Sequence, residues 1–399
     1  MKLSLLSCLL VSQALATSMP AIYSGIKPKR GVSRDAAAVY HQRRASAPTA
    51  TECNLTLPIA PKIVIISMFT PEANTWYHRP DFDLLAHNIS LPGLSPLFPS
   101  IHCDSAGSIC QVITGEGEIN AAASINALWL SPSFNLTSSY FLIAGIGGVN
   151  PSLATTGSVT FARYAVQLDL QYQISLSKDA ANTSIATIPQ GSDFASEYPQ
   201  DLYGTEVFEL NNNLKSLAVS LARRAALNDT TAAQAYRAKY SSPPANAAPS
   251  VVECDSGTSN TYWSGAVLGD TFSAYTKLLT NGSGVYCNSQ QEDNATLESL
   301  LRGAIARKLD FARIILMRTA SDFDRAPPDE TEEEHLLTAE QAGFGPSIEN
   351  IWLAGRQIVQ DVVGKWDEVY EQGVKAENYV GDLWGSLDGT ATRDIGLLA

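Results

Sequence analysis

Short, uninterrupted runs of apolar residues recur along the chain, and a glycine-rich or polar turn follows most of them. Such runs are typical of strands that are buried on both faces of a parallel sheet. We expect strands in residues 63–66, 111–113, 140–143, 158–165 and 312–317. Helical spacing of apolar or small residues marks 120–130 and 297–305. The alternation predicts an α/β fold with a central mixed, mainly parallel sheet flanked by helices.

The 399-residue chain is expected to begin its ordered part near Lys62 and to form one domain over 61–399. The alternation breaks at about 173–251, which we interpret as a large insertion with a helix-like stretch at 214–224. The amphipathic segment 347–374 is expected to pack on the outside of the sheet.

Residues 1–16 have the features of a signal peptide. Lys2 supplies a positive charge, residues 3–15 form a short apolar stretch, and Ala14-Leu-Ala16 is a small-x-small cleavage pattern. The stretch is too short to span a bilayer comfortably, and no later segment reaches 18 apolar residues. We therefore expect a secreted protein, extracellular or cell-wall associated, without a transmembrane segment.

Residues 17–60 show little apolar periodicity and are interpreted as a flexible leader or propeptide. Its dibasic pairs, Lys29-Arg30 and Arg43-Arg44, are either processing sites or part of a solvated linker. Seven N-glycosylation sequons predict a glycoprotein. They begin at Asn54, Asn88, Asn135, Asn182, Asn228, Asn281 and Asn294.

Five cysteines remain once Cys8 leaves with the signal peptide. In an oxidising compartment an odd number leaves one unpaired or intermolecular. We expect a bridge between Cys103 and Cys110, which flank a hairpin-like tip, and a second between Cys254 and Cys287. No metal site is expected, because there is no C-x-x-C motif and the five histidines are scattered.

The net charge of −13, from 27 basic and 40 acidic side chains, gives the chain no electrostatic attraction to nucleic acid or anionic lipid. Dinucleotide, P-loop, G-x-S-x-G and H-E-x-x-H motifs are missing, so no cofactor is expected. What recurs instead is a carboxylate after a strand. Glu72 follows the first strand and Ser321-Asp322 follows the last, and ligands bind at the carboxyl ends of strands in open α/β sheets.

Taken in order, several segments resemble the motifs of nucleoside phosphorylases and nucleosidases. They are residues 62–72, 114–123, 144–151 with 156–159, 268–272, 291–293 and 318–322. Within that superfamily the chain most resembles the purine nucleoside permease family. Tyr262-Trp-Ser-Gly, Gly269-Asp and Glu292-Asp-Asn-Ala-Thr are similar to that family's own signatures. The resemblance implies a nucleoside-phosphorylase-like fold and a purine nucleoside as the partner.

The resemblance also implies roles for single residues. Asp322 would donate a proton to N7 of the base, and Glu72 would bind or activate a water. Glu292, with Gln291 in place of the family's Met, would hold the ribose hydroxyls. Phe272 and Ser321 would contact the base. Glycine turns at the pocket are expected at Gly115, Gly117, Gly145 and Gly147.

Two departures from the superfamily pattern bear on function. The phosphorylases carry a phosphate-binding Arg on the strand that corresponds to residues 141–144, and this chain has none there. Phosphorolysis is therefore disfavoured. The sequon at Asn294 lies beside the proposed pocket, and we expect it to be unoccupied.

Three function classes remain open from the sequence. The first is a nucleoside-binding protein that assists uptake, and the second is an N-ribosyl hydrolase or a phosphorylase. The third is a storage or surface protein that kept the fold and lost the chemistry. Acids at all three implied positions favour ligand handling over storage.

Overall fold

The structure, a computed structural model, describes residues 58–176 and 185–387. The predicted signal peptide, almost all of the predicted leader, Cys53 and the sequons at Asn54 and Asn182 lie outside the described residues. The described residues belong to one unit, Thr51–Ala399.

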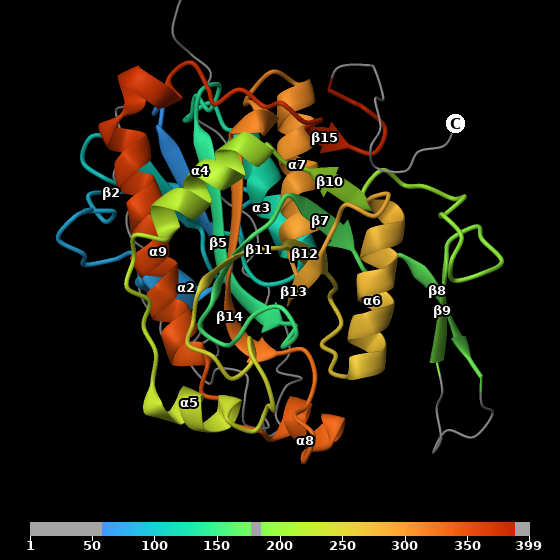
Figure 1. The fold of residues 1–399 in the computed structure, drawn as a ribbon. Coiled ribbons are helices and arrows are strands. Elements are labelled where there is room, and N and C mark those ends of the chain that lie inside the picture. The colour runs from blue at the N-terminus through green and yellow to red at the C-terminus, as the bar shows by residue number, and fades with distance from the viewer. Residues whose placement is uncertain (1–57, 177–184, 388–399) are drawn as a thin grey trace, which may run out of the picture. The chain divides into compact units, whose positions relative to one another are not determined.

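A 13-stranded mixed sheet forms the centre of this unit (Figure 1). Its main path runs β15-β10-β7-β12-β13-β5-β1-β4-β3-β2, and β14 pairs with β5 beside that path. The strands of the first half are β1 (Ile63–Ser67), β2 (His87–Ser90), β3 (Ser100–Cys103), β4 (Ile109–Ile113), β5 (Tyr140–Val149), β6 (Val159–Phe161) and β7 (Tyr164–Gln167). Those of the second half are β10 (Val207–Glu209), β11 (Val251–Glu253), β12 (Asp255–Thr258), β13 (Tyr286–Gln290), β14 (Ile314–Phe323) and β15 (Gly381–Asp382).

The middle of the sheet is parallel, as the apolar runs predicted. β1 pairs in parallel with β4 and β5, and β5 pairs in parallel with β14. All five residues of β1 are buried, because both faces of the strand are covered. Antiparallel pairs, such as β13 with β5 and β3 with β4, make the sheet mixed. The predicted α/β fold with a mixed, mainly parallel sheet flanked by helices is confirmed.

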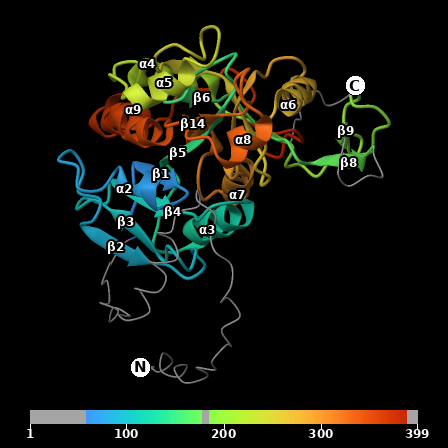
Figure 2. The ribbon, with the colours of Figure 1, turned by 90° about the horizontal axis from the view of Figure 1, so that it is seen from below.

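Helices cover both faces of the sheet (Figure 2). On one face α3 (Glu118–Leu130) packs against α7 (Asp293–Ile305), over a core that includes Ile66 and Val112. On the other face α4 (Asn212–Ala222) and α9 (Phe344–Gly364) share a core with Ile63 and Ile65. The alternating sides of β1 therefore enter two separate cores. The segment expected as amphipathic forms α9 and a short turn at Trp366–Tyr370.

The described residues form four further α-helices, which are shorter or lie at the periphery. They are α2 (Thr70–Asn74), α5 (Thr231–Arg237), α6 (Ala266–Leu279) and α8 (Glu332–Leu337). Figure 1 shows α5 and α8 together at one end of the sheet, beyond the carboxyl end of β14. A single 3₁₀ turn, Phe311–Arg313, precedes β14.

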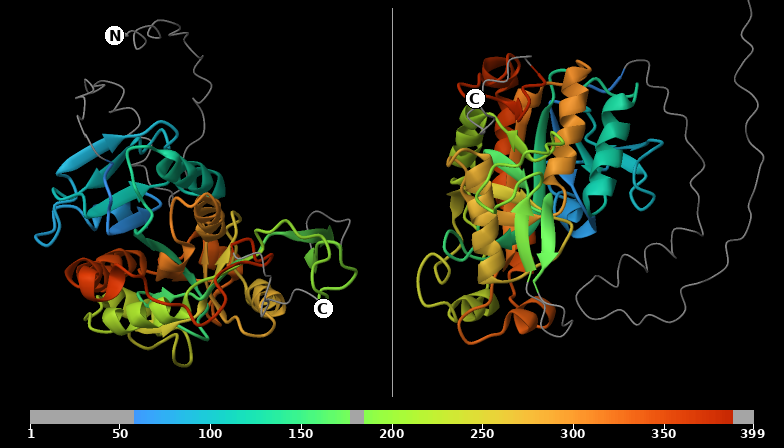
Figure 3. Two further views of the ribbon diagram at one scale, coloured as in Figure 1. Left: turned by 90° about the horizontal axis from the view of Figure 1, so that it is seen from above. Right: turned by 90° about the vertical axis from the view of Figure 1, so that its right-hand side faces the viewer.

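The region 173–251, expected as an insertion, divides between the main sheet and a projecting hairpin. β10 joins the main sheet through β7 and β15, and α4 packs beside α9. By contrast, β8 (Gln171–Ser175) and β9 (Ile185–Pro189) pair only with each other and stand away from the main sheet (Figure 3).

Both expected disulfides are present, Cys103–Cys110 and Cys254–Cys287. Cys103 and Cys110 face each other across the antiparallel pair of β3 and β4. Cys254 precedes β12 and Cys287 lies in its neighbour β13, so the second bridge ties the part of the sheet that carries Glu292. Along residues 58–176 and 185–387, none of the helices is both long and apolar enough to cross a bilayer.

Replacing Cys103 and Cys110 together by Ser is expected to lower the free energy of unfolding by about 2–3 kcal/mol, because the short closed loop no longer restricts the unfolded chain. Urea unfolding of the double variant and the oxidised parent measures the difference. As the control, both proteins are compared again fully reduced, where the difference should vanish because neither then holds the Cys103–Cys110 bridge. An oxidised parent no more stable than the variant would contradict the prediction.

Candidate functional site

The predicted site residues gather along the second half of β5, from Gly145 to Val149. In register, Arg318 of β14 lies beside Gly145, and Asp322 lies beside Gly148. On the other side, Ser289 of β13 pairs with Gly148. β1 ends at Ser67, and Glu72 follows it in α2. Polar side chains from β14, from β13 and from the segment after β1 therefore lie beside one short stretch of β5.

The glycines of β5 make room for these side chains. A Cβ atom on Gly145 would lie 2.6 Å from Arg318 Nη1 and 2.7 Å from Glu72 Oε1, and one on Gly147 would lie 2.6 Å from the carbonyl oxygen of Ser289. All three distances are too short for a carbon atom. The expectation of glycine turns at Gly145 and Gly147 is wrong, since both lie within the extended strand β5. Their function is to admit side chains from the neighbouring strands.

A glycine turn does form between β4 and α3, as predicted. Gly115 and Gly117 have φ values of +86° and +85°, a backbone region that favours glycine. The turn directs the N–H of Gly117 to Oε1 of Glu292, at 2.9 Å. The start of α3 is thereby fixed to the end of β13, and Glu116 is placed near the same carboxylate.

Glu292 and Asp293 hold a fully buried arginine. Arg318 donates from Nη2 to Glu292 Oε2 at 3.1 Å and to Asp293 Oδ1 at 2.6 Å, and from Nη1 to the carbonyl oxygen of Ile146 at 2.9 Å. Its side chain is only 2% exposed. Burial raises the pKa of Glu292, while the charge of Arg318 and the N–H of Gly117 oppose that shift. The arginine thus favours the ionised form of Glu292.

Glu72 is buried at the end of β1 and receives two backbone hydrogen bonds. The N–H of Met68 donates to Oε2 at 2.6 Å, and the N–H of Ile146 donates to Oε1 at 2.7 Å. Burial nevertheless raises the pKa of Glu72 to about 8, against the opposing charge of Arg318. A carboxyl group whose pKa lies near neutrality can both accept and release a proton.

Asp322 lies on an irregular part of β14. The pairing register with β5 shifts between Ala320 and Asp322, which leaves Ser321 as the extra residue of a bulge. Bulges re-aim the side chains next to them. The Ser321 hydroxyl donates to Asp322 Oδ1 at 2.5 Å. Burial raises the pKa of Asp322, and the Ser321 hydrogen bond opposes the shift. Asp322 is thus biased toward the protonated form that a general acid needs.

The loop between β12 and α6 carries an aromatic residue toward these acids. Tyr262 is 74% exposed. Desolvation by neighbouring atoms and the charges of Glu116, Asp322, Glu292 and Glu72 raise its pKa to about 12, so its hydroxyl lies within electrostatic reach of all four. The Nε2 of Gln291 donates to the carbonyl oxygen of Asn260 in this loop, at 3.1 Å. Gln291 therefore anchors the loop beside Glu292.

Phe272, which the resemblance places against the base, is buried. It is in the middle of α6, 6% exposed, on the inner face that also carries Tyr275 and Leu279. Its ring packs edge-on against Trp263, with centroids 4.9 Å apart. The helical spacing of these three residues explains why Phe272 faces the core.

Sequence reasoning missed Arg318, Asp293 and the role of Tyr262. A signal for Arg318 was available, because it interrupts the apolar run 312–317 at its carboxyl end. An arginine inside a buried strand requires buried partners, since an unpaired charge there is costly. The Glu292-Asp293 pair was the obvious source of those partners.

Asn294 is buried, and both polar atoms of its side chain form hydrogen bonds. Nδ2 donates to the carbonyl oxygen of Thr205 at 2.8 Å, and Oδ1 accepts from the Thr258 hydroxyl at 2.7 Å. The other sequon asparagines in the described residues are exposed, namely Asn88, Asn135, Asn228 and Asn281. A glycan on Asn294 would have no room in the folded chain.

We therefore expect peptide mapping of protein made in a secretory host to find glycans on the exposed sequons and an unmodified Asn294. The four exposed sites act as internal controls, because they pass through the same enzymes. Substantial glycan occupancy at Asn294 in folded protein would contradict the structure around it.

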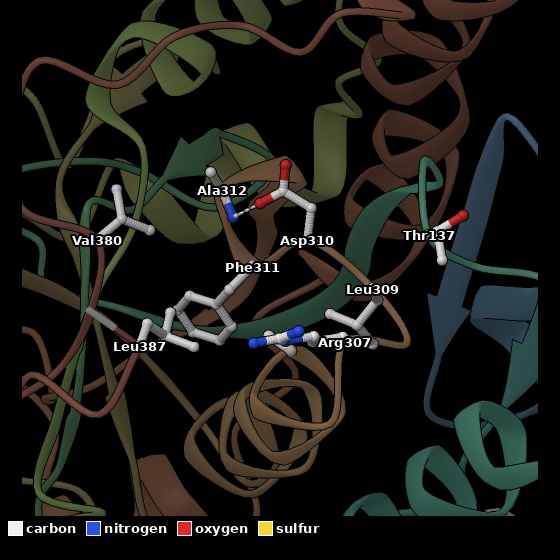
Figure 4. Close-up of a pocket in the computed structure, with 9 residues that line it drawn as sticks. Thr137, Arg307, Leu309, Asp310, Phe311, Ala312, Val380 and Leu387 are labelled. Atoms are coloured by element: carbon white, nitrogen blue, oxygen red, sulfur yellow. Dashed lines mark hydrogen bonds between the residues drawn. The ribbon is translucent and has the colours of Figure 1, made fainter. Parts of the chain in front are cut away.

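A separate pocket lies at the opposite end of β14 and contains none of the candidate residues (Figure 4). Its volume is about 370 Å³, and its lining includes Leu309, Phe311 and Val380 with Arg307 and Asp310 at the side. Phe311 and Ala312 precede β14, whereas Asp322 is near its other end.

Fold and site together define an α/β protein in which three carboxyl groups and one buried arginine lie along the second half of one long strand. The profile of the purine nucleoside permease family matches residues 60–375. A purine nucleoside permease of Candida albicans is 47% identical over 335 residues, which is 82% of each chain. A probable purine nucleoside permease of Schizosaccharomyces pombe is 40% identical over 314 residues, 77% of this chain and 90% of that one. The chain belongs to the purine nucleoside permease family.

Solved structures with a similar course of the chain include a hydrolase and a nucleosidase. Futalosine hydrolase of Helicobacter pylori has a TM-score of 0.46 and 13% identity, over 76% of this chain and 98% of that chain. The 5′-methylthioadenosine/S-adenosylhomocysteine nucleosidase of Neisseria meningitidis has a TM-score of 0.43 and 13% identity, over 76% and 98%.

Proposed function

We propose that the protein binds purine nucleosides outside the cell and hydrolyses their N-glycosidic bond. The observation that carries the proposal is the grouping of two carboxyl groups with raised pKa, Glu72 and Asp322, around a third carboxylate that Arg318 holds in place. The names of the curated relatives support a purine nucleoside as the ligand. The two disulfides and the exposed sequons support an extracellular location.

In this proposal Asp322 is the general acid. It transfers its proton to N7 of the purine as the bond between C1′ and N9 breaks, and the base leaves as a neutral molecule. The Ser321 hydroxyl, 2.5 Å from Oδ1, orients the carboxyl group. General acid catalysis of this kind contributes about 10²–10⁴ in rate.

In this proposal Glu292 binds the ribose hydroxyl groups. The N–H of Gly117 and Arg318 Nη2 each occupy one of its oxygens, and each oxygen keeps a lone pair for a ribose hydroxyl. Its negative charge also stabilises the positive charge that develops on the ribosyl group. Tyr262 is the exposed ring next to these acids and takes the base-stacking role that the sequence assigned to Phe272.

Glu72 completes the reaction with water. The water oxygen adds to C1′, and Glu72 accepts the proton that the water loses. Because its pKa is about 8, only the ionised fraction of Glu72 can take up that proton, and this fraction grows as the pH rises towards 8. Each turnover leaves Asp322 ionised and Glu72 protonated, and exchange with solvent water releases the proton of Glu72 and returns one to Asp322 before the next turnover.

Phosphorolysis is a weaker alternative, because the negative charges of the site disfavour a bound phosphate. The charges of Glu116, Asp322, Glu292 and Glu72 all act on Tyr262, and Arg318 donates from each of its three nitrogens to protein acceptors. A phosphate dianion placed there would face several carboxylates without a free bidentate partner. Binding for uptake without cleavage is the other alternative, and the permease name of the relatives favours it.

Ligand binding is tested by calorimetry with adenosine, guanosine and inosine. Replacing Glu292 by Gln should weaken nucleoside binding about 10- to 100-fold, because charge-assisted hydrogen bonds to the ribose hydroxyls are lost. Glu298→Gln is the matched control, since Glu298 forms an i,i+4 pair with the exposed Arg302 on the adjoining helix. Equal affinity of the Glu292→Gln variant and the parent would remove Glu292 from the site.

A further inference from the structure

His335 is a buried histidine that the proposed reaction does not use. It lies on α8, and its Nε2 is 2.9 Å from the carbonyl oxygen of Phe323, the residue that follows Asp322. The N–H of Phe323 donates to Oε1 of Gln341 at 2.8 Å. Side chains of the segment 335–341 therefore hold both polar backbone groups of Phe323.

This contact closes an open edge of β14. β6 pairs with β14 only at Met317, Arg318 and Thr319, so no strand covers the edge at Phe323. An open edge leaves backbone groups without partners. Beyond the bulge at Ser321, Asp322 and Phe323 pair with Gly148 and Val149 of β5 on one edge. His335 and Gln341 hold Phe323 from the other edge, so the peptide next to Asp322 is fixed on both sides.

The other ring nitrogen faces acceptors as well. Nδ1 lies 2.8 Å from Tyr236 Oη and 3.8 Å from Glu330 Oε1, and Tyr236 donates to Glu330 at 3.1 Å. Lys239 Nζ pairs with the second oxygen of Glu330 at 2.8 Å. The charged form of the imidazole thus has an acceptor on each side.

We propose that His335 is a positioning residue for Asp322: it holds the carbonyl group of Phe323, the next residue along the chain, and its imidazole adds a positive charge near the Asp322 carboxyl group when it is protonated. The inference rests on the proposed function, in which Asp322 is the acid. The electrostatics agree. Burial has the largest effect and raises the pKa of Asp322, while the Ser321 hydrogen bond and, to a smaller extent, the charge of His335 lower it. Tyr236, Asp324 and Tyr262 are the other titratable groups that interact with Asp322.

The first test does not depend on activity. The titration of the Asp322 carboxyl is followed by ¹³C NMR in the full-length protein, and its signal is assigned by its loss in Asp322→Asn. His335→Gln keeps a donor for the Phe323 carbonyl but removes the charge, so the midpoint should move to higher pH. Glu333→Gln removes an exposed charge from the same helix and should leave the midpoint in place. An unchanged midpoint in His335→Gln would overturn the proposal.

The second test uses kinetics. His335→Ala, which also removes the donor, should lower kcat roughly tenfold or more and leave KM within about twofold. In His335→Gln the loss of activity at alkaline pH should begin at higher pH, since the acid keeps its proton longer. If the role of His335 is purely structural, the variants should have a lower melting temperature, but the pH at which activity is lost on the alkaline side should stay the same. If the parent cleaves no nucleoside, the proposed function fails, while the NMR titration still decides the role of His335.

Discussion

Replacing Asp322 by Asn is expected to lower kcat at least about 100-fold, or about 3 kcal/mol of barrier, with little change in the dissociation constant of the nucleoside. The amide keeps the shape of the side chain and still accepts a hydrogen bond from Ser321, but it has no acidic proton for N7. Single-turnover cleavage and calorimetric binding of the same variant measure the two effects separately.

Asp329→Asn is the control for this prediction, because Asp329 is an exposed acid on the same connection between β14 and α8. It should cleave like the parent. An Asp322→Asn variant that keeps more than a tenth of the parent's kcat would show that another group delivers the proton.

Replacing Arg318 by Met is expected to have the largest effect on stability. The change leaves Glu292 and Asp293, 5% and 0% exposed, without their counter-charge. Breaking a buried ion pair by removing one partner costs about 3–5 kcal/mol. Urea unfolding at neutral pH measures the loss. The loss should shrink as the pH falls, because burial already raises the pKa of Glu292 and its protonated form needs no counter-charge.

Arg302→Met is the matched control for Arg318→Met. Arg302 is also an arginine paired with a glutamate, but its side chain is 62% exposed. An exposed i,i+4 pair contributes about 0.3–0.5 kcal/mol, so this variant should unfold close to the parent. Equal unfolding free energies for the two variants would contradict the account of the buried pair.

The fold was largely predictable because its signal is local. Runs such as 63–66 and 140–143 are apolar without interruption, and a strand buried on both faces needs that pattern. The continuation of β5 beyond residue 143, as far as Val149, was not predictable in the same way. Gly145 and Gly147 lower strand propensity. The strand continues because Arg318 and Glu72 fill the space beside Gly145, and Ser289 and Asn288 fill the space beside Gly147.

The site was predictable in its acids and less so in its aromatic residues. Glu72, Glu292 and Asp322 each follow or end a strand, so the topology alone brings them to β5. Phe272 and Tyr262 lie close together in the sequence, and the choice between them depends on where α6 begins. The helix starts at Ala266, which turns Phe272 into the core and leaves Tyr262 in the preceding loop.

The most direct test of the proposed function is product analysis. Full-length protein purified from the medium of a secreting host is incubated with purine nucleosides, with and without phosphate, and the sugar and base are identified. We predict free ribose and free base at a rate that does not depend on phosphate. A rate that rises in proportion to phosphate, with ribose 1-phosphate as the product, would contradict hydrolysis. Intact nucleoside in both reactions, despite calorimetric binding, would contradict cleavage itself.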